Sequence, residues 1–153
     1  MNRVRAAVVG AGYLGRFHAQ KFGGIAAAEL VGICDIDAEA GQSLARDCNA
    51  AYYADHRDLV GKIDAVTIAT STSAHFELAK FFLENGIHVL VEKPMTNTSE
   101  QGRTLTATAN AANLKLQVGH VERFNPALVS ARDQLGSVQF IECHRLAPFK
   151  GRG

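Results

Sequence analysis

The chain has no tryptophan, three prolines and three cysteines among its 153 residues. Cys34, Cys48 and Cys143 are far apart and odd in number, which argues against a disulfide framework or a zinc site. No apolar run is long enough to span a membrane, and Met1 leads directly into a short apolar segment instead of a signal peptide. We therefore expect a globular protein of the reducing cytoplasm, with no membrane partner and no metal site.

Neither sign of charge is in clear excess, since 16 basic residues face 15 acidic ones and the formal net charge is +1. No basic stripe is present, so nucleic acid is not expected as a partner. A chain of 153 residues with 47% hydrophobic residues is long and apolar enough for one domain with a sizeable core. Composition alone therefore leaves the function to local motifs.

Short apolar segments alternate with longer segments of helical pattern. This alternation predicts a parallel sheet covered by helices on both faces, and the leading candidate is the doubly wound α/β Rossmann fold. The candidate helix N-caps are Asp37, Ser73 and either Thr98 or Ser99. We expect strands at residues 5–9, 29–34, 51–53, 65–69, 87–91 and 114–118, and helices at 14–22, 38–48, 74–84 and 99–113.

The last part of the chain has a different pattern. Pro126 is expected in the first turn of a helix, where its missing N–H is tolerated. Residues 137–145 read as a longer strand, which Gln139, Glu142 and His144 interrupt. We expect this strand to lie outside the parallel sheet, with one face toward water.

Three glycines follow the first expected strand and open the first expected helix. Gly10 permits a tight turn, Gly12 lets the backbone approach a pyrophosphate, and Gly15 lets the helix pack closely on the strand. The helix N-terminus offers free N–H groups to phosphates. Asp35 ends the second strand, where its carboxylate can accept hydrogen bonds from both ribose hydroxyls and would repel a 2′-phosphate. The pattern favours NAD over NADP.

Two other interpretations of the glycines remain open at this point. A tight turn beside a surface aspartate needs no ligand at all. S-adenosylmethionine-dependent methyltransferases use a related glycine loop and acid.

The chain resembles a known family through several motifs taken together. These are the Gly10–Gly15 loop, Asp35, Glu92-Lys93-Pro94 and the stretch QVGHVERFNPA at residues 117–127. Together they resemble the Gfo/Idh/MocA oxidoreductases, which are NAD(P)-dependent enzymes acting mostly on sugars and polyols. The resemblance extends over essentially the whole chain and implies hydride transfer between a nicotinamide cofactor and a sugar, sugar-nucleotide or polyol.

The resemblance also implies roles for particular residues. Lys93 corresponds to the lysine of the family's catalytic site, and Arg123 is a candidate for a substrate phosphate, a cofactor carboxamide or a hinge ion pair. Many members carry Pro-Asn in the loop after the fourth strand, where this chain has Thr-Ser. The cofactor-binding set implied is Gly10, Gly12, Tyr13, Leu14, Gly15, Asp35, Thr70, Ser71, Thr72, His75, Glu92, Lys93 and Arg123.

Physical arguments support Lys93 independently of the family. It follows a buried strand at the carboxyl edge, where doubly wound folds bind ligands, and Pro94 favours an extended conformation for it. A partly desolvated ammonium there would stabilise a developing alkoxide. The alternative is an ordinary surface lysine in a turn. His56 and His88 are expected to be solvated or packed, and His18 to face the helix flank near the glycine loop.

Family members continue into a second α+β domain that completes the substrate pocket. We therefore expect residues 1–120 to form the dinucleotide-binding domain, and residues 121–153 a linker helix and the first strand of an incomplete second domain. The stretches ERFNPA and HRLAPF resemble members that act on UDP-linked amino sugars at C3. A full-length form is expected to be a homo-oligomer. The alternative is a self-standing NAD-binding module without catalysis.

Overall fold

The structure is a computed structural model that describes residues 3–132, 135–144 and 146. Its contacts divide the chain into two compact units, Met1–His120 and Val121–Gly153.

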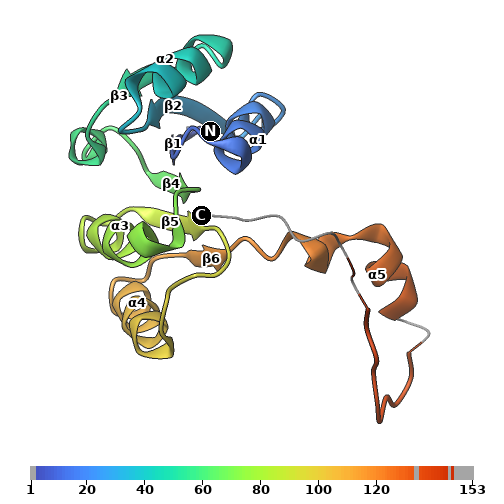
Figure 1. Ribbon diagram of the computed structural model, residues 1–153. Coiled ribbons are helices and arrows are strands. Elements are labelled where there is room, and N and C mark those ends of the chain that lie inside the picture. The colour runs from blue at the N-terminus through green and yellow to red at the C-terminus, as the bar shows by residue number, and fades with distance from the viewer. Residues whose placement is uncertain (1–2, 133–134, 145, 147–153) are drawn as a thin grey trace. The chain divides into compact units, whose positions relative to one another are not determined.

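The first unit is built on a sheet of six parallel strands (Figure 1). The strand order is β3-β2-β1-β4-β5-β6, which is the order of a dinucleotide-binding Rossmann fold. The predicted doubly wound α/β fold is therefore confirmed. The strands are β1 (Val4–Val9), β2 (Ala28–Cys34), β3 (Ala51–Tyr53), β4 (Ala65–Ile68), β5 (His88–Val91) and β6 (Leu116–Val118).

Helices cover both faces of this sheet and divide the core into two clusters. Along β1, Val8 belongs to the cluster that contains Ala19 of α1 and Leu44 of α2. Ala7 and Val9 belong to the other cluster, which α3 and α4 complete. Successive side chains of a strand point to opposite faces, so one short apolar run serves both layers. The helices are α1 (Tyr13–Phe22), α2 (Ala38–Asp47), α3 (Thr72–Glu84) and α4 (Ser99–Ala111), with a short 3-10 helix η1 (His56–Leu59) after β3.

Two of the predicted N-caps are confirmed and one is wrong. The Asp37 carboxylate accepts hydrogen bonds from the N–H groups of Glu39 and Ala40, and Thr98 forms a capping box with Gln101. The predicted cap Ser73 instead lies inside α3, because Ser71 takes the extended cap conformation and the helix begins at Thr72. This places the hydroxyls of residues 70–71 at the carboxyl edge of the sheet, ahead of the helix.

The second unit contains the 3-10 helix η2 (Val121–Phe124) and the helix α5 (Pro126–Arg132). Pro126 opens α5 as predicted, and the Asn125 side chain accepts from the N–H of Ala127. The strand predicted at 137–145 is wrong for residues 137–144, and residue 145 lies outside the described residues. An extended segment becomes a strand only by pairing, and no described segment pairs with residues 137–144.

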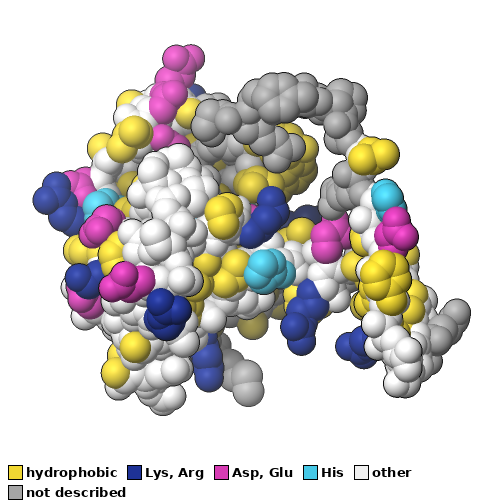
Figure 2. All heavy atoms as spheres, turned by 60° about the horizontal axis from the view of Figure 1, so that its bottom comes forward, with side chains coloured by type: hydrophobic (Ala, Val, Ile, Leu, Met, Phe, Trp, Pro, Cys, Tyr) yellow, Lys and Arg dark blue, Asp and Glu magenta, His cyan; other side chains and the backbone are white. Residues whose placement is uncertain are grey.

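The surface carries both signs of charge. The face shown in Figure 2 carries Lys and Arg side chains as well as Asp and Glu side chains, with apolar side chains among them. Among the described residues, no helix has the length and apolar character needed to cross a membrane.

Phe82 provides a test of the α3 side of the core. Its side chain is fully buried between α3 and the sheet, so Phe82→Ala should lower the free energy of unfolding by about 3–5 kcal/mol. Urea unfolding followed by circular dichroism measures this. The control is Phe140→Ala, since Phe140 is 81% exposed and should change stability by less than about 0.5 kcal/mol. Equal effects of the two substitutions would contradict the core assignment.

Candidate cofactor-binding site

The three glycines form the turn that the sequence predicts. Gly10 has a φ of +102°, and a Cβ there would lie 2.6 Å from the carbonyl oxygen of Ala69. A Cβ on Gly15 would lie 1.7 Å from the carbonyl oxygen of Gly10, so helix α1 can pack at this distance only without a side chain. Gly12 differs, because a Cβ there would meet nothing within 4 Å. Its backbone therefore borders open space at the N-terminus of α1.

Asp35 is fixed beside this turn by backbone groups. Its Oδ2 accepts from the N–H of Ala11 and its Oδ1 accepts from the N–H of Asp37 at 2.8 Å. The Tyr52 hydroxyl also donates to the Asp35 carbonyl oxygen at 3.0 Å. The carboxylate is half-buried at the end of β2, in the position from which it can face a ribose.

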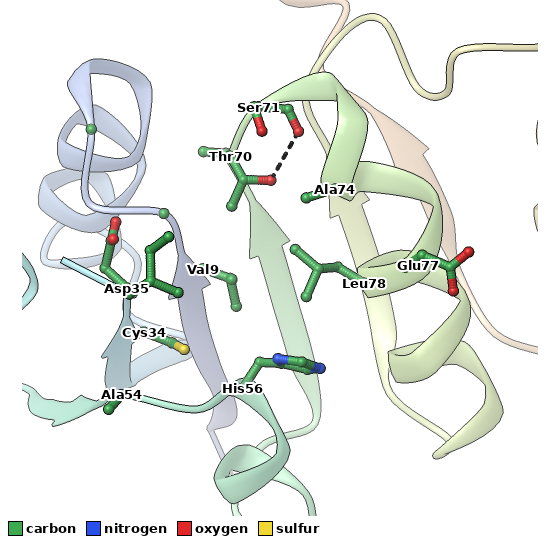
Figure 3. A pocket seen from close by; sticks show the side chains of 14 residues that line it. Val9, Cys34, Asp35, Ala54, His56, Thr70, Ser71, Ala74, Glu77 and Leu78 are labelled. Atoms are coloured by element: carbon green, nitrogen blue, oxygen red, sulfur yellow. Dashed lines mark hydrogen bonds between the residues drawn. The ribbon is translucent and has the colours of Figure 1, made fainter.

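A cavity of about 690 Å³ lies between the ends of β1, β2 and β4 and the first turns of α3 (Figure 3). Figure 3 shows Asp35 and Cys34 on one side, Leu78 and Ala74 of α3 on the other, and Thr70 and Ser71 at one end. The walls are mostly apolar, as is usual for small-molecule sites. The lining residues are Val9, Gly10, Gly12, Cys34, Asp35, Ile36, Ala54, His56, Ala69, Thr70, Ser71, Ala74, Glu77 and Leu78.

Two titratable groups in the lining are held neutral. Burial, with the nearby Asp35 carboxylate, raises the pKa of the Cys34 thiol to about 12, so the thiol stays protonated and unreactive. Burial lowers the pKa of His56, although the carboxylate of Asp55 opposes this shift. The His56 ring packs edge-on against Phe81 and Phe82, with centroid distances of 4.8 and 5.9 Å. His56 therefore presents a neutral imidazole to the cavity.

His75 supports the loops around the site instead of lining the cavity. It is 1% exposed, with Nδ1 2.9 Å from the Pro94 carbonyl oxygen and Nε2 3.2 Å from the Thr70 carbonyl oxygen. Both ring nitrogens thus face protein groups. The side chain joins the loop after β4 to the loop that carries Lys93.

The remaining predicted residues lie outside the cavity lining. Tyr13 and Leu14 are exposed at the start of α1, where Tyr13 packs edge-on against Phe17 at 5.0 Å. Lys93 is exposed after β5, so desolvation of its ammonium would have to come from bound substrate and cofactor. The other residues outside the lining are Gly15, Thr72, His75 and Glu92 in the first unit and Arg123 in η2 of the second unit.

Comparison with known proteins agrees with this geometry. Residues 4–120 match the Gfo/Idh/MocA family, described as an oxidoreductase family with an NAD-binding Rossmann fold. The chain belongs to the Gfo/Idh/MocA oxidoreductase family. This membership confirms the predicted resemblance and argues against the methyltransferase alternative.

Three relatives show the range of this family. A UDP-N-acetylglucosamine 3-dehydrogenase from Acidithiobacillus ferrooxidans is 38% identical over 99% of this chain and 48% of its own length. Its crystal structure superimposes with a TM-score of 0.82 at 36% identity, over 88% of this chain and 44% of that one. An inositol 2-dehydrogenase from Saccharopolyspora erythraea is 34% identical over 86% of this chain and 41% of its own length.

A third relative is the WlbA dehydrogenase from Bordetella pertussis, solved in complex with NADH and UDP-GlcNAcA. It superimposes with a TM-score of 0.81 at 29% identity, over 88% of this chain and 40% of that one. The chain thus spans about half or less of the length of the Gfo/Idh/MocA proteins it matches.

Sequence reasoning missed contacts of two histidines. The expectation that the His56 imidazole is packed is confirmed by its edge-on contacts with Phe81 and Phe82, but it did not place the ring in the cavity lining, just after β3. Its position after a strand's carboxyl end could have marked it, since ligands of open α/β sheets bind at that edge. His18 was placed on the helix flank, but its contact with Glu92, 74 residues away, has no local signal.

The lowered pKa of His56 makes a prediction about stability and pH. Because the folded-state pKa lies below the unfolded value of about 6.5, the unfolded chain binds more protons between the two. The stability that neutral His56 contributes to the folded chain is fully present above about pH 6.5. It is lost as the pH falls through the pKa of His56 in the folded state. The melting temperature should therefore fall less between pH 7 and 5 in His56→Gln than in the wild type. Both proteins measured at pH 8 supply the reference, and an unchanged slope would contradict the prediction.

Proposed function

We propose that this chain is the cofactor-binding part of an NAD-dependent dehydrogenase that acts on a sugar-type substrate. The observation that carries the proposal is the open backbone of Gly12 beside the fixed carboxylate of Asp35 at one edge of the sheet. An N-terminal helix turn suits a pyrophosphate and a carboxylate suits ribose hydroxyls, so these residues fit a dinucleotide. When bound, the nicotinamide ring supplies the hydride acceptor or donor.

Different residues of the chain would bind different parts of the cofactor. Gly12 and the N-terminus of α1 would bind the pyrophosphate, and Asp35 the adenosine ribose. Ile36, which is 98% exposed, follows Asp35 at a position where an arginine would bind the 2′-phosphate of NADP. The apolar walls from Leu78 and Ala74, with the neutral His56 ring, would enclose the adenine. These features support NAD as the preferred cofactor.

Lys93 is proposed as the catalytic residue at the substrate end. Its ammonium follows β5 at the same sheet edge and is exposed, so it is free to meet a substrate hydroxyl. In its amine form Lys93 would accept the hydroxyl proton as hydride leaves the carbinol carbon. The ammonium so formed would stabilise the substrate oxygen and return the proton in the reverse, reducing direction.

A sugar nucleotide is the substrate class that the relatives favour. The Acidithiobacillus enzyme is named for UDP-N-acetylglucosamine, and the Bordetella enzyme was solved with UDP-GlcNAcA. The identity of 38% over nearly the whole chain places more weight on this class than on inositol. Arg123 remains a prediction for a substrate phosphate, a cofactor carboxamide or a hinge ion pair. The homo-oligomer and the cytoplasmic location also stay predictions.

The first test measures cofactor binding through the fluorescence of NADH, because the chain has no tryptophan to interfere. We expect saturable binding of NADH, and NADP⁺ should displace the bound NADH at least about tenfold less well than NAD⁺ does, a ratio that needs only about 1.4 kcal/mol. Asp35→Asn keeps the shape of the side chain and removes its charge, so it should weaken NADH binding and narrow the preference for NAD⁺ over NADP⁺.

The matched control is Asp37→Asn, because Asp37 caps α2 and does not line the cavity. It should leave both affinities within about twofold. Absence of NADH binding by a folded wild-type chain, or displacement by S-adenosylmethionine, would refute the proposal. If Asp35→Asn leaves the preference for NAD⁺ over NADP⁺ unchanged, Asp35 does not bind the ribose.

The catalytic role of Lys93 can be tested in a chimera. Residues 1–120 of this chain would replace the matching part of the Acidithiobacillus enzyme, and turnover would be assayed with NAD and UDP-N-acetylglucosamine. Lys93→Met should lower kcat/KM by about 10²–10³-fold, the range of general acid–base catalysis, and leave NADH affinity within about twofold. Lys62→Met is the control, since Lys62 packs over the Tyr53 ring. Equal turnover of the two variants would overturn the assignment.

A further inference from the structure

A buried carboxylate lies between the glycine-loop helix and the backbone of Lys93. The Glu92 side chain is 6% exposed, and its Oε1 lies 2.9 Å from Nε2 of His18 on α1. Its Oε2 accepts from the backbone N–H of Lys93 at 3.2 Å. A carboxylate this deeply buried requires such partners, because desolvation without them is costly. We call the His18–Glu92 contact, with the Lys93 N–H, the His18–Glu92 bridge.

The backbone around Glu92 is anchored to its neighbouring strands. The Glu92 N–H donates to the Ile68 carbonyl oxygen at the end of β4 at 3.0 Å, and the Gly119 N–H donates to the Val91 carbonyl oxygen at 2.9 Å. Glu92 therefore has little freedom except in its side chain. That side chain reaches one helix that opens with the glycine turn and one amide that belongs to the proposed catalytic residue.

Gly119 makes room for this carboxylate. A Cβ at residue 119 would lie 2.7 Å from Oε1 and 2.9 Å from Oε2 of Glu92. Gly119 directly follows β6, the edge strand of the sheet. Its φ lies outside the left-handed region that favours glycine. The small residue is thus required by the close approach of the Glu92 carboxylate.

We propose that the His18–Glu92 bridge is a positioning device that couples cofactor binding on α1 to the placement of Lys93. The inference rests on the proposed function, since it gives the bridge a purpose only if α1 binds NAD and Lys93 is catalytic. Neither residue lines the cavity, so both act through other groups. Movement of α1 on binding a pyrophosphate is transmitted to Oε1, and through Oε2 to the Lys93 amide.

The test uses isotope-labelled chain, with the Lys93 amide resonance and the NADH dissociation constant as readouts. Glu92→Gln removes the charge at constant shape, and His18→Leu removes the ring nitrogen. Both should shift the Lys93 amide and weaken NADH binding by roughly three- to tenfold, the usual range for a coupled site. His18→Gln, whose amide nitrogen can still reach Oε1, should restore most of both.

Three further variants separate positioning from general support of the fold. Gly119→Ala pushes on the carboxylate without deleting either partner, and should reproduce the Glu92→Gln effects. The double variant His18→Leu/Glu92→Gln leaves no uncompensated charge, and should bind NADH no worse than His18→Leu alone. Glu142→Gln is the matched control, because it removes the carboxylate of an exposed His144–Glu142 pair. It should change neither readout.

The outcomes are distinct for the two proposals. A wild-type chain that binds no NADH refutes the proposed function and, with it, the coupling to cofactor binding. The Lys93 amide then still shows whether the bridge positions Lys93. An unmoved Lys93 amide in Glu92→Gln and Gly119→Ala overturns the inference. If the wild-type chain binds NADH, the inference is also overturned when every bridge variant binds NADH as tightly as Glu142→Gln does. The inference is also overturned if His18→Gln and His18→Leu weaken NADH binding equally. A side-chain N–H donor to Glu92 Oε1 at residue 18 would then make no difference.

Discussion

The reversal of strand order between β1 and β4 is the constraint on which the rest of the site depends. β1 pairs with β2 on one side and β4 on the other, and the connecting helices leave toward opposite faces. The chain segments that follow these strands therefore diverge, and the cavity opens between them. The glycine turn, Asp35 and the Thr70–Ser71 hydroxyls all come from those three strand ends. A different strand order would scatter the same residues along the edge.

Close backbone approach then determines where side chains are absent. A Cβ on Gly10 would meet the Ala69 carbonyl, one on Gly15 would meet the Gly10 carbonyl, and one on Gly119 would meet the Glu92 carboxylate. Among the glycines of the turn, Gly12 has open space before it, which fits a ligand in place of a protein neighbour. The same residue type thus serves packing at three positions and exposes the backbone at the fourth.

The two carboxylates of the edge show how environment separates their roles. Asp35 is half-buried, accepts two backbone N–H bonds and faces the cavity, so it can still accept from a ligand hydroxyl. Glu92 is buried against Gly119 and is engaged by His18 and the Lys93 amide. The sequence analysis placed both in the cofactor site, Asp35 from its position after the second strand and Glu92 from the resemblance to the family. Only the packing around them distinguishes the carboxylate that lines the cavity from the one that is buried against protein groups.

The sequence by itself determined the strand–helix alternation, the glycine turn and the position of Asp35 at the end of the second strand. Apolar periodicity and glycine spacing are local properties, so they can be read from the chain directly. The sequence also determined the Asp37 cap and narrowed the cap of α4 to Thr98 or Ser99, because cap partners lie within three residues; the structure shows that Thr98 is the cap. The tertiary structure alone decided that His75 supports two loops, that His56 enters the cavity and that His18 meets Glu92. It also decided that residues 137–144 form no strand, since a strand exists only with a partner. These features depend on contacts between distant segments, which no local pattern encodes.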